Sequence, residues 1–365
     1  MGLQIGIVGL PNVGKSTLFN ALTKANAPVA SYPFTTIDRN VGVAQVPDER
    51  LERIAALVGP ERTVHTTIEF VDIAGLVKGA HRGEGLGNQF LGYIRNVDAI
   101  AMVVRCFRDP EIPHISGVLD PIEDIEVVDL ELILADLATV EKRLEKVQRA
   151  AKRRPRDYEA ELGLLDRLRH HLERGQKAIG LEVTDKEREI LRGFNLLTAK
   201  PRLYIANVGE EDLPDGGELG KKVVEAAAAE DADALVLCAK LEMELAEWPE
   251  EEAAAYRAEL GLGESGLQKL VKKGYRLLDL ITFFTTTGGK EVRAWTLRRG
   301  ATAWEAAGRI HSDMQRGFVR AEVVSYEDLM RAGSFAAVRE EGLLRLEGRE
   351  YQVQDGDIIH IRFTQ

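Results

Sequence analysis

A glycine-rich loop close to the N-terminus carries the residue types that hold phosphate groups. Residues 9–17, GLPNVGKST, fit the pattern G-x-x-x-x-G-K-[ST]. An apolar run at residues 3–8 precedes the loop, and a helical pattern at residues 15–22 follows it. In the order strand, loop, helix, backbone N–H groups point at bound phosphate oxygens. We therefore predict a site for a nucleoside triphosphate.

Single side chains of this loop have distinct expected roles. Lys15 brings a positive charge to the β- and γ-phosphates, and the Ser16 hydroxyl is a predicted Mg²⁺ ligand. Asn12 offers a side-chain oxygen, which we hypothesise holds a K⁺ ion beside the phosphates. The other residues of the loop predicted to bind the nucleotide are Val13, Gly14 and Thr17.

A threonine-containing loop follows the first predicted helix. Residues 30–38, ASYPFTTID, combine a proline with several hydroxyl side chains. In P-loop proteins such a threonine ligates Mg²⁺ when the triphosphate is bound, and we favour Thr36 over Thr35 for this role. The alternative is that both threonines enter the strand predicted at residues 40–46, because threonine has a high β-propensity.

A second motif of a nucleotide switch ends the next strand. Residues 66–71 are predicted to form a strand that runs into DIAG at residues 72–75. Asp72 is expected to hold Mg²⁺ through water. The backbone N–H of Gly75 is expected to contact the γ-phosphate, since glycine permits a close approach.

The residue after Gly75 bears on the rate of hydrolysis. Ras-like enzymes have a glutamine there that orients the attacking water, whereas this chain has Leu76, which cannot hydrogen-bond to water. We therefore expect slow hydrolysis. His114, in the loop after the strand predicted at residues 99–104, is the candidate for positioning the water; the alternative is a structural or solvated histidine. The K⁺ ion at Asn12 is expected to replace part of a missing arginine finger.

The base-binding motif departs from that of guanine-binding proteins. A strand at residues 201–206 ends in N-V-G-E, where those proteins have N-K-x-D. Val208 replaces the lysine, and Glu210, one methylene longer than aspartate, should misplace the carboxylate for bidentate binding of guanine. Asn207, with a donor and an acceptor, suits adenine. We expect ATP to be used at least as well as GTP. The alternative is a degenerate guanine site, because one such change shifts selectivity by only about 1–3 kcal/mol.

A further loop is expected to contact the base through its backbone. The strand predicted at residues 234–237 ends in Cys238 and Ala239, followed by Lys240, where guanine-binding proteins carry S-A-K. Cys238 and Ala239 complete the set of predicted nucleotide-binding residues.

The composition fits a chain of two or three domains. It has 365 residues, of which 45% are hydrophobic, and a net charge of −11. This charge argues against nucleic-acid binding by the whole surface, but it allows a local basic patch. Cys106 and Cys238 have no metal-ligand spacing and cannot form a disulfide framework. With no signal-like or membrane-spanning run, we expect a cytoplasmic protein that binds no membrane.

Long helical patterns interrupt the nucleotide-binding segment. Residues 126–195 are predicted to form an inserted antiparallel helical hairpin, with a basic turn at residues 149–157 that Pro155 breaks. Residues 141–177 contain twelve Lys or Arg and seven Asp or Glu, a net charge of +5 in an acidic chain. Such a stretch is either an ordinary solvated surface or a contact for RNA phosphates.

The chain thus divides into three predicted parts. Residues 1–125 and 196–278 form an α/β nucleotide-binding domain with a mostly parallel sheet, residues 126–195 the hairpin, and residues 279–365 a small C-terminal domain. The last part has one helix-like segment at residues 303–311 and strand-like runs at residues 280–286, 292–297, 318–324 and 357–363. It has no catalytic cluster, so we expect a binding module.

Together, these motifs resemble those of the Obg-like ATPase (YchF) family over essentially the whole chain. The resemblance rests on residues 9–16, 32–36, 72–80 and 207–210, and on a C-terminal segment similar to a TGS domain that starts near Asp279. It implies a G-domain-like P-loop NTPase fold with an inserted coiled coil and a β-grasp-like TGS domain. It also implies ATP preference, slow hydrolysis and association with ribosomes.

The sequence therefore favours an Mg²⁺-dependent ATPase that uses GTP poorly, hydrolyses ATP slowly and acts as a nucleotide-controlled switch. The expected partners are ATP and the ribosome, as a whole or through its large subunit. RNA contacts are expected at the basic hairpin and the TGS-like domain, and the protein is expected to be a monomer. Two alternatives stay open: an Obg-type GTPase, and a nucleotide-regulated binding module with negligible turnover.

Overall fold

The computed structural model describes residues 3–25, 40–73, 86–114, 117–152, 154–287 and 289–364. Its contacts divide the chain into two compact units, Met1–Val43 with Glu69–Leu270 and Ala44–Ile68 with Val271–Gln365. The division differs from the expected domain ranges in three respects: the hairpin stays within the first unit, the C-terminal part begins at Val271, and residues 44–68 belong to the second unit. Their helix α2 (Glu49–Val58) is amphipathic and buries Leu51 and Ile54 in the core of that unit.

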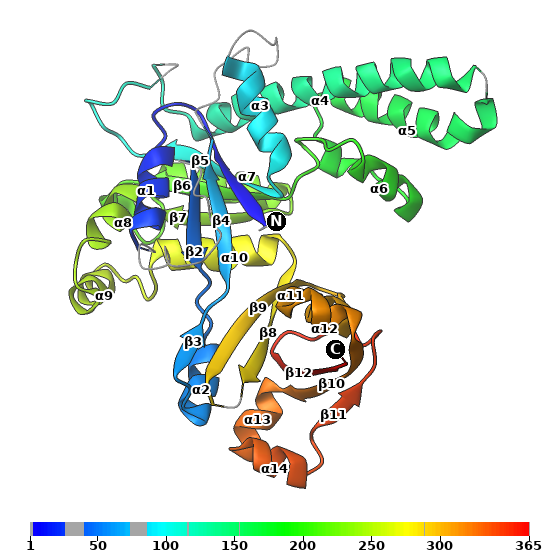
Figure 1. Cartoon of the computed structure of the whole chain (residues 1–365). Coiled ribbons are helices and arrows are strands. Elements are labelled where there is room, and N and C mark those ends of the chain that lie inside the picture. Colours follow the sequence, from blue (N-terminus) through cyan, green and yellow to red (C-terminus); the bar gives the residue numbers. More distant parts are fainter. Residues whose placement is uncertain are drawn as a thin grey trace. The chain divides into compact units, whose positions relative to one another are not determined.

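A six-stranded sheet with the order β2-β4-β1-β5-β6-β7 forms the centre of the first unit (Figure 1). The strands are β1 (Gln4–Val8), β2 (Val41–Gln45), β4 (Thr67–Asp72), β5 (Ala99–Cys106), β6 (Arg202–Val208) and β7 (Asp233–Leu237). Parallel pairing joins β4 to β1, β1 to β5, β5 to β6 and β6 to β7, which confirms the predicted α/β fold. Every residue of β5 and β6 is buried, as expected of parallel strands covered on both faces. The carboxyl ends of these strands share one edge, where ligands bind in such sheets.

Helices flank this sheet (Figure 1). They include α1 (Lys15–Ala25), α3 (Leu86–Asn96), α7 (Gly217–Ala229), α8 (Ala239–Leu245) and α9 (Glu250–Glu259), while α10 (Gly266–Leu277) crosses the boundary between the units. No helix in the described part of the chain has both the length and the apolar composition to span a bilayer.

The helical hairpin is formed by α4 (Pro121–Ala151) and α5 (Pro155–Glu173), which run side by side (Figure 1). Each helix has proline near its first position, where the missing N–H group costs no hydrogen bond. The 3₁₀ turn η3 (Ala178–Gly180) and helix α6 (Asp185–Arg192) follow. The facing side chains pack into one apolar cluster, whose buried members include Val140, Leu144, Val147, Leu165, Leu168 and Leu172.

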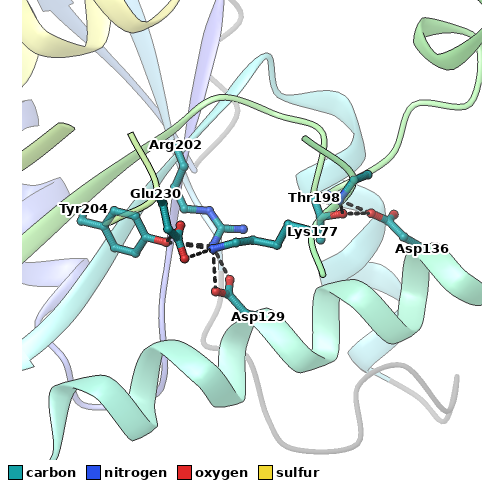
Figure 2. Close-up of polar contacts among 8 residues, drawn as sticks. Asp129, Asp136, Lys177, Thr198, Arg202, Tyr204 and Glu230 are labelled. Carbon is teal, nitrogen blue, oxygen red and sulfur yellow. Dashed lines mark hydrogen bonds and ion pairs between the residues drawn. The ribbon is translucent and has the colours of Figure 1, made fainter. Parts of the chain in front are cut away.

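Polar side chains fix the base of the hairpin to the sheet (Figure 2). Asp129 of α4 pairs with Arg202 of β6 and with Lys177, whose Nζ atom lies 3.0 Å from Asp129 Oδ2. The Tyr204 hydroxyl of β6 donates to Glu230 Oε2 at 2.7 Å, and Glu230 also pairs with Lys177. The strand that leads to the predicted base-binding motif is therefore the strand to which the hairpin is attached.

The second unit has a mixed sheet with the order β11-β10-β12-β8-β9-β3. Its strands are β3 (Arg62–Val64), β8 (Leu280–Thr287), β9 (Glu291–Arg298), β10 (Phe318–Ser325), β11 (Arg345–Glu347) and β12 (Asp357–Phe363). Alternate side chains of β12 enter two cores, Ile359 and Ile361 one and Ile358 the other. Helices α11 (Ala303–Ile310) and α12 (Ser312–Arg316) contribute to the first core, and α2, α13 (Tyr326–Ala332) and α14 (Phe335–Glu340) to the second. The four longer strands and α11 agree with the prediction. The prediction missed the helices α12, α13 and α14, which have five to seven residues, and the three-residue strands β3 and β11, because such short elements leave little periodic pattern.

Candidate functional site

The predicted phosphate loop joins β1 to α1 at the carboxyl edge of the first sheet. Gly14 has a φ of 95°, and a Cβ atom built on it would lie 2.2 Å from Asn207 Nδ2. Only glycine fits at this position, both for its backbone angle and for its contact. Asn12 also has a positive φ of 64°, and its amide nitrogen donates to the Pro113 carbonyl at 3.3 Å.

Lys15 is held inside this loop with its charge in a poorly solvated place. The residue is 7% exposed, and its Nζ atom donates to the Leu10 carbonyl at 2.6 Å. Burial lowers the pKa of its ammonium group to about 8, although the nearby Asp72 carboxylate acts in the opposite direction. A phosphate bound nearby would therefore stabilise the charged form of this ammonium group.

The two predicted metal ligands that the structure describes lie together. Ser16 lies in the first turn of α1 and Asp72 ends β4, and the Ser16 hydroxyl donates to Asp72 Oδ2 at 3.3 Å. Among the described residues, no group of three or more His, Cys, Asp or Glu side chains forms a metal site by itself. One hydroxyl and one carboxylate fit Mg²⁺, which takes most of its other ligands from phosphates and water.

Asn207, at the end of β6, bridges two loops. It is 4% exposed; its Nδ2 atom donates to the Val13 carbonyl and its Oδ1 atom accepts from the Ala239 N–H, both at 2.9 Å. The amide therefore ties the phosphate loop to the loop after β7. One donor hydrogen and one lone pair of the predicted adenine-reading group are already used in this bridge.

These loops surround a cavity of about 640 Å³. The predicted site residues that line it are Asn12, Gly14, Lys15, Ser16, Thr17, Asn207, Val208, Glu210, Cys238 and Ala239. Val13, in the phosphate loop, is buried, and its carbonyl group accepts the hydrogen bond from Asn207. The structure thus brings together the phosphate and base motifs that the sequence places nearly two hundred positions apart, since Asn207 lies 194 residues after Val13.

Arg105 is a residue of the site that sequence reasoning missed. It is 3% exposed at the end of β5, and its guanidinium group donates to the carbonyls of Ile112 at 2.9 Å, Phe107 at 3.3 Å and Asp109 at 3.4 Å. These three residues line the cavity, so Arg105 shapes one wall of it. The sequence feature that could have indicated Arg105 is its position as a single arginine near the end of an otherwise apolar strand.

The Glu210 carboxylate has a partner that no local pattern indicates. Its Oε1 atom accepts a hydrogen bond from the hydroxyl of Tyr256, on α9, at 2.5 Å. The side chain at the guanine-reading position is therefore already engaged by a protein group.

His114 lies against α4 and is absent from the lining of the cavity. Its Nε2 atom is 3.1 Å from Asp124 Oδ2, and both side chains are mostly covered. Burial raises the pKa of Asp124, while the contact with His114 opposes that rise. The geometry links the loop of residues 107–114 to the first turn of the hairpin. Thr35, Thr36, Gly75 and Leu76 lie outside the described residues, and their expected roles stay predictions.

Family models match both ends of the chain. A model described as "50S ribosome-binding GTPase" matches residues 4–133, and the YchF-GTPase_C model, described as "Protein of unknown function", matches residues 280–364. The ribosome-binding ATPase YchF of Bacillus subtilis (strain 168) is 54% identical over 366 residues, with 100% of both chains covered. The protein of the same name from Escherichia coli O157:H7 is 48% identical over 364 residues, also with 100% of both covered.

Among solved structures, that of the Schizosaccharomyces pombe YchF GTPase has a TM-score of 0.88 and 37% identity, covering 99% of this chain and 98% of that one. A GTP binding protein from Pyrococcus horikoshii OT3 shares the fold, with a TM-score of 0.63 and 21% identity over 99% of this chain and 100% of that one. Because relatives at 48% and 54% identity match from end to end, the chain belongs to the YchF family.

Proposed function

We propose that the protein is a slow, Mg²⁺-dependent ATPase that acts as a nucleotide-controlled switch on ribosomes. The observation that carries this proposal is the cavity on which the phosphate loop, Asn207, Glu210 and the Cys238 loop converge. By its family and its P-loop the chain is a nucleoside-triphosphate hydrolase. The bacterial relatives are named ATPases and the S. pombe structure a GTPase, so the choice of ATP has to be argued from the site itself.

Phosphate binding is assigned to Lys15 and the backbone amides of its loop. Ser16 and Asp72 would hold Mg²⁺, because their oxygens are adjacent and of the type this ion prefers. The ion would neutralise the negative charge on the phosphates during transfer. Thr36 is the proposed additional ligand, and the Gly75 N–H the proposed γ-phosphate sensor.

Asn207 by itself does not distinguish adenine from guanine. Its two bonds leave one N–H and one lone pair, and N7 of either purine can accept from that N–H. We therefore infer that Glu210, rather than Asn207, determines which base is bound. Guanine-binding proteins have an aspartate at this position, whereas this chain has Glu210, which already accepts a hydrogen bond from Tyr256. In this proposal, the preference for ATP follows from that difference.

Slow hydrolysis is proposed because Leu76 offers no hydrogen bond to the attacking water. His114 remains the proposed water-positioning residue, which would require its ring to leave Asp124. The K⁺ ion is proposed to bind the Asn12 side-chain oxygen, since the amide nitrogen is the atom that contacts Pro113.

Ribosome binding is proposed from the names of the bacterial relatives and from the basic hairpin. Arg154 and Arg156 at the hairpin turn are exposed and suited to RNA phosphates. The TGS-like second unit is the other proposed contact. A ribosomal partner implies a cytoplasmic location, and we propose that the protein reaches it as a monomer.

Nucleotide affinity and turnover test this function. Dissociation constants and phosphate release are measured for ATP and GTP, with and without ribosomes, in K⁺ and in choline buffers. We expect tighter binding of ATP, slow phosphate release and faster release in K⁺, with Lys15→Ala as the control that loses binding of both nucleotides.

Other outcomes select the alternatives. A tenfold preference for GTP would support an Obg-type GTPase. Bound nucleotide without phosphate release would support a binding module, and equal rates in K⁺ and choline would remove the K⁺ ion from the proposal.

A further inference from the structure

Glu210 lies on the wall of the nucleotide cavity with one carboxylate oxygen engaged. It begins the turn η4 (Glu210–Asp212), just after β6. The hydrogen bond from the Tyr256 hydroxyl to Oε1 is 2.5 Å long, and bonds of hydroxyls to carboxylates at this length belong to the strong class. The bond therefore fixes the direction of the carboxylate.

Tyr256 is itself held in place by apolar packing. It reaches Glu210 from α9, 46 residues along the chain. Its ring packs in a cluster with Cys238 and Leu241, which line the cavity, and its centroid lies 5.6 Å from that of Trp248. The position of the hydroxyl thus depends on the ring and its neighbours, and a phenylalanine would keep the same packing.

The two purines make different demands on the Glu210 carboxylate. Guanine offers two neighbouring donors, N1–H and the N2 amino group, which one carboxylate binds only when both oxygens face the base. Adenine offers one donor, its N6 amino group, so a single oxygen is enough. With Oε1 accepting from Tyr256 and held in that direction, Oε2 is the oxygen that keeps both lone pairs for a base.

We propose that Tyr256 is a specificity-determining positioning residue, which holds Glu210 so that the cavity favours adenine over guanine. The inference rests on the proposed purine-nucleotide function of the cavity and names the contact that sets its base selectivity. Tyr256 acts through Glu210 and is not among the residues that line the cavity. Its bond to Glu210 also raises the pKa of its hydroxyl, in keeping with the hydroxyl acting as the donor of this bond.

The ratio of GDP to ADP dissociation constants tests this role. Diphosphates carry the same bases and are not hydrolysed, so binding is measured at equilibrium. In Tyr256→Phe the ratio should fall by about three- to tenfold, because Oε1 is released to bind the second guanine donor. The ratio divides out any general loss of affinity, which a merely structural tyrosine would cause for both nucleotides.

Two further variants isolate the contact. In a Glu210→Ala background, adding Tyr256→Phe should leave the ratio unchanged, since the hydroxyl has no carboxylate to hold. Tyr158→Phe makes the same chemical change in the hairpin cluster and should also have no effect. An unchanged ratio in Tyr256→Phe, or an equal shift in the Glu210→Ala background, would overturn the inference.

The same titrations separate this inference from the proposed function. A wild-type protein that binds GDP more tightly than ADP would refute the ATP preference, while the effect of Tyr256→Phe relative to wild type would still decide the role of Tyr256. A protein that binds neither nucleotide would refute both.

Discussion

Asn207 shows how one buried amide can align two ends of a ligand site. Its side chain contacts the Val13 carbonyl and the Ala239 N–H, and Gly14 gives it room because it lacks a Cβ atom. A shift of the phosphate loop would therefore break a bond that also holds the loop after β7. At the scale of single residues, this bridge fixes the phosphate loop relative to the loop after β7, and so the proposed phosphate and base contacts relative to each other.

Lys15 should make nucleotide binding dependent on pH on the alkaline side. Its pKa of about 8 results from burial, and phosphates bind its protonated form. Above that pH the free protein must take up a proton on binding, so the affinity for Mg²⁺-free ADP should fall by up to about tenfold per pH unit. Titrations from pH 7 to pH 10 measure this, since the terminal phosphate of ADP is already ionised there. Lys15→Met, which keeps an apolar stem and cannot titrate, should bind weakly without this dependence; constant wild-type affinity through pH 8 would contradict the assignment.

Among the elements, the hairpin depends on buried polar contacts at its base as well as on its apolar seam. Asp136 of α4 has 0% exposure, and its carboxylate accepts bonds from Leu197 N and Thr198 N at 2.8 Å and from the Thr198 hydroxyl at 2.7 Å (Figure 2). These bonds fasten the chain that leaves the hairpin just before it enters β6. The hairpin and the strand leading to Asn207 therefore share a rigid attachment.

Asp136→Asn should weaken this attachment. An amide cannot accept at both former oxygens, so at least one buried donor loses its partner, at a cost of about 2 kcal/mol in the free energy of unfolding. Urea titrations followed by circular dichroism measure the change. Asp166→Asn, on an exposed site of α5 whose carboxylate lies 3.6 Å from Arg169, is the matched control and should cost less than about 0.5 kcal/mol. Equal changes in the free energy of unfolding for the two substitutions would show that the buried bonds of Asp136 do not stabilise the attachment.

At the scale of the whole molecule, charge is distributed unevenly. The chain carries −11, yet residues 141–177 carry twelve basic and seven acidic side chains. Several of these cations, such as Arg143 and Arg167, are paired with Glu161 and Glu187. Arg154, between α4 and α5, is accessible to a partner, as its side chain is 79% exposed.

Replacing Arg153, Arg154 and Arg156 by glutamate should abolish salt-sensitive co-sedimentation with ribosomes. Each phosphate contact that is lost reduces the slope of log affinity against log salt by about one, and the new charges repel RNA. Lys221 and Lys222 on α7 are exposed as well, and replacing both by glutamate is the control for added negative charge, with a change of −4 against −6 in the turn variant. Unchanged sedimentation of the turn variant would count against the hairpin as the contact.

Much of the fold follows from local patterns in the sequence. The strands β1, β5 and β6 are short apolar runs, and the hairpin helices have apolar residues at helical spacing, so both could be predicted from neighbouring residues alone. Helix α2 could not be assigned to its unit in this way, because its amphipathic pattern shows that it packs but not against what.

The candidate site also contains residues that local sequence patterns predict and residues that only the fold brings together. The sequence by itself determined the phosphate loop and Ser16, because a glycine-rich turn between a strand and a helix produces its geometry from contiguous residues. It also indicated Asp72, because this residue ends a predicted strand. Only the tertiary structure decided that Asn207 is a bridge, that Arg105 builds a wall of the cavity and that Tyr256 engages Glu210. The contacts of Arg105 reach only as far as Pro113, but they depend on how the loop after β5 folds. The contacts of Asn207 and Tyr256 join residues brought together by the packing of separate elements, and Glu210 and Tyr256 lie 46 positions apart. No pattern of neighbouring residues encodes such a long-range contact. The sequence could therefore indicate Glu210 as a site residue, but only the tertiary structure gives the orientation of its carboxylate.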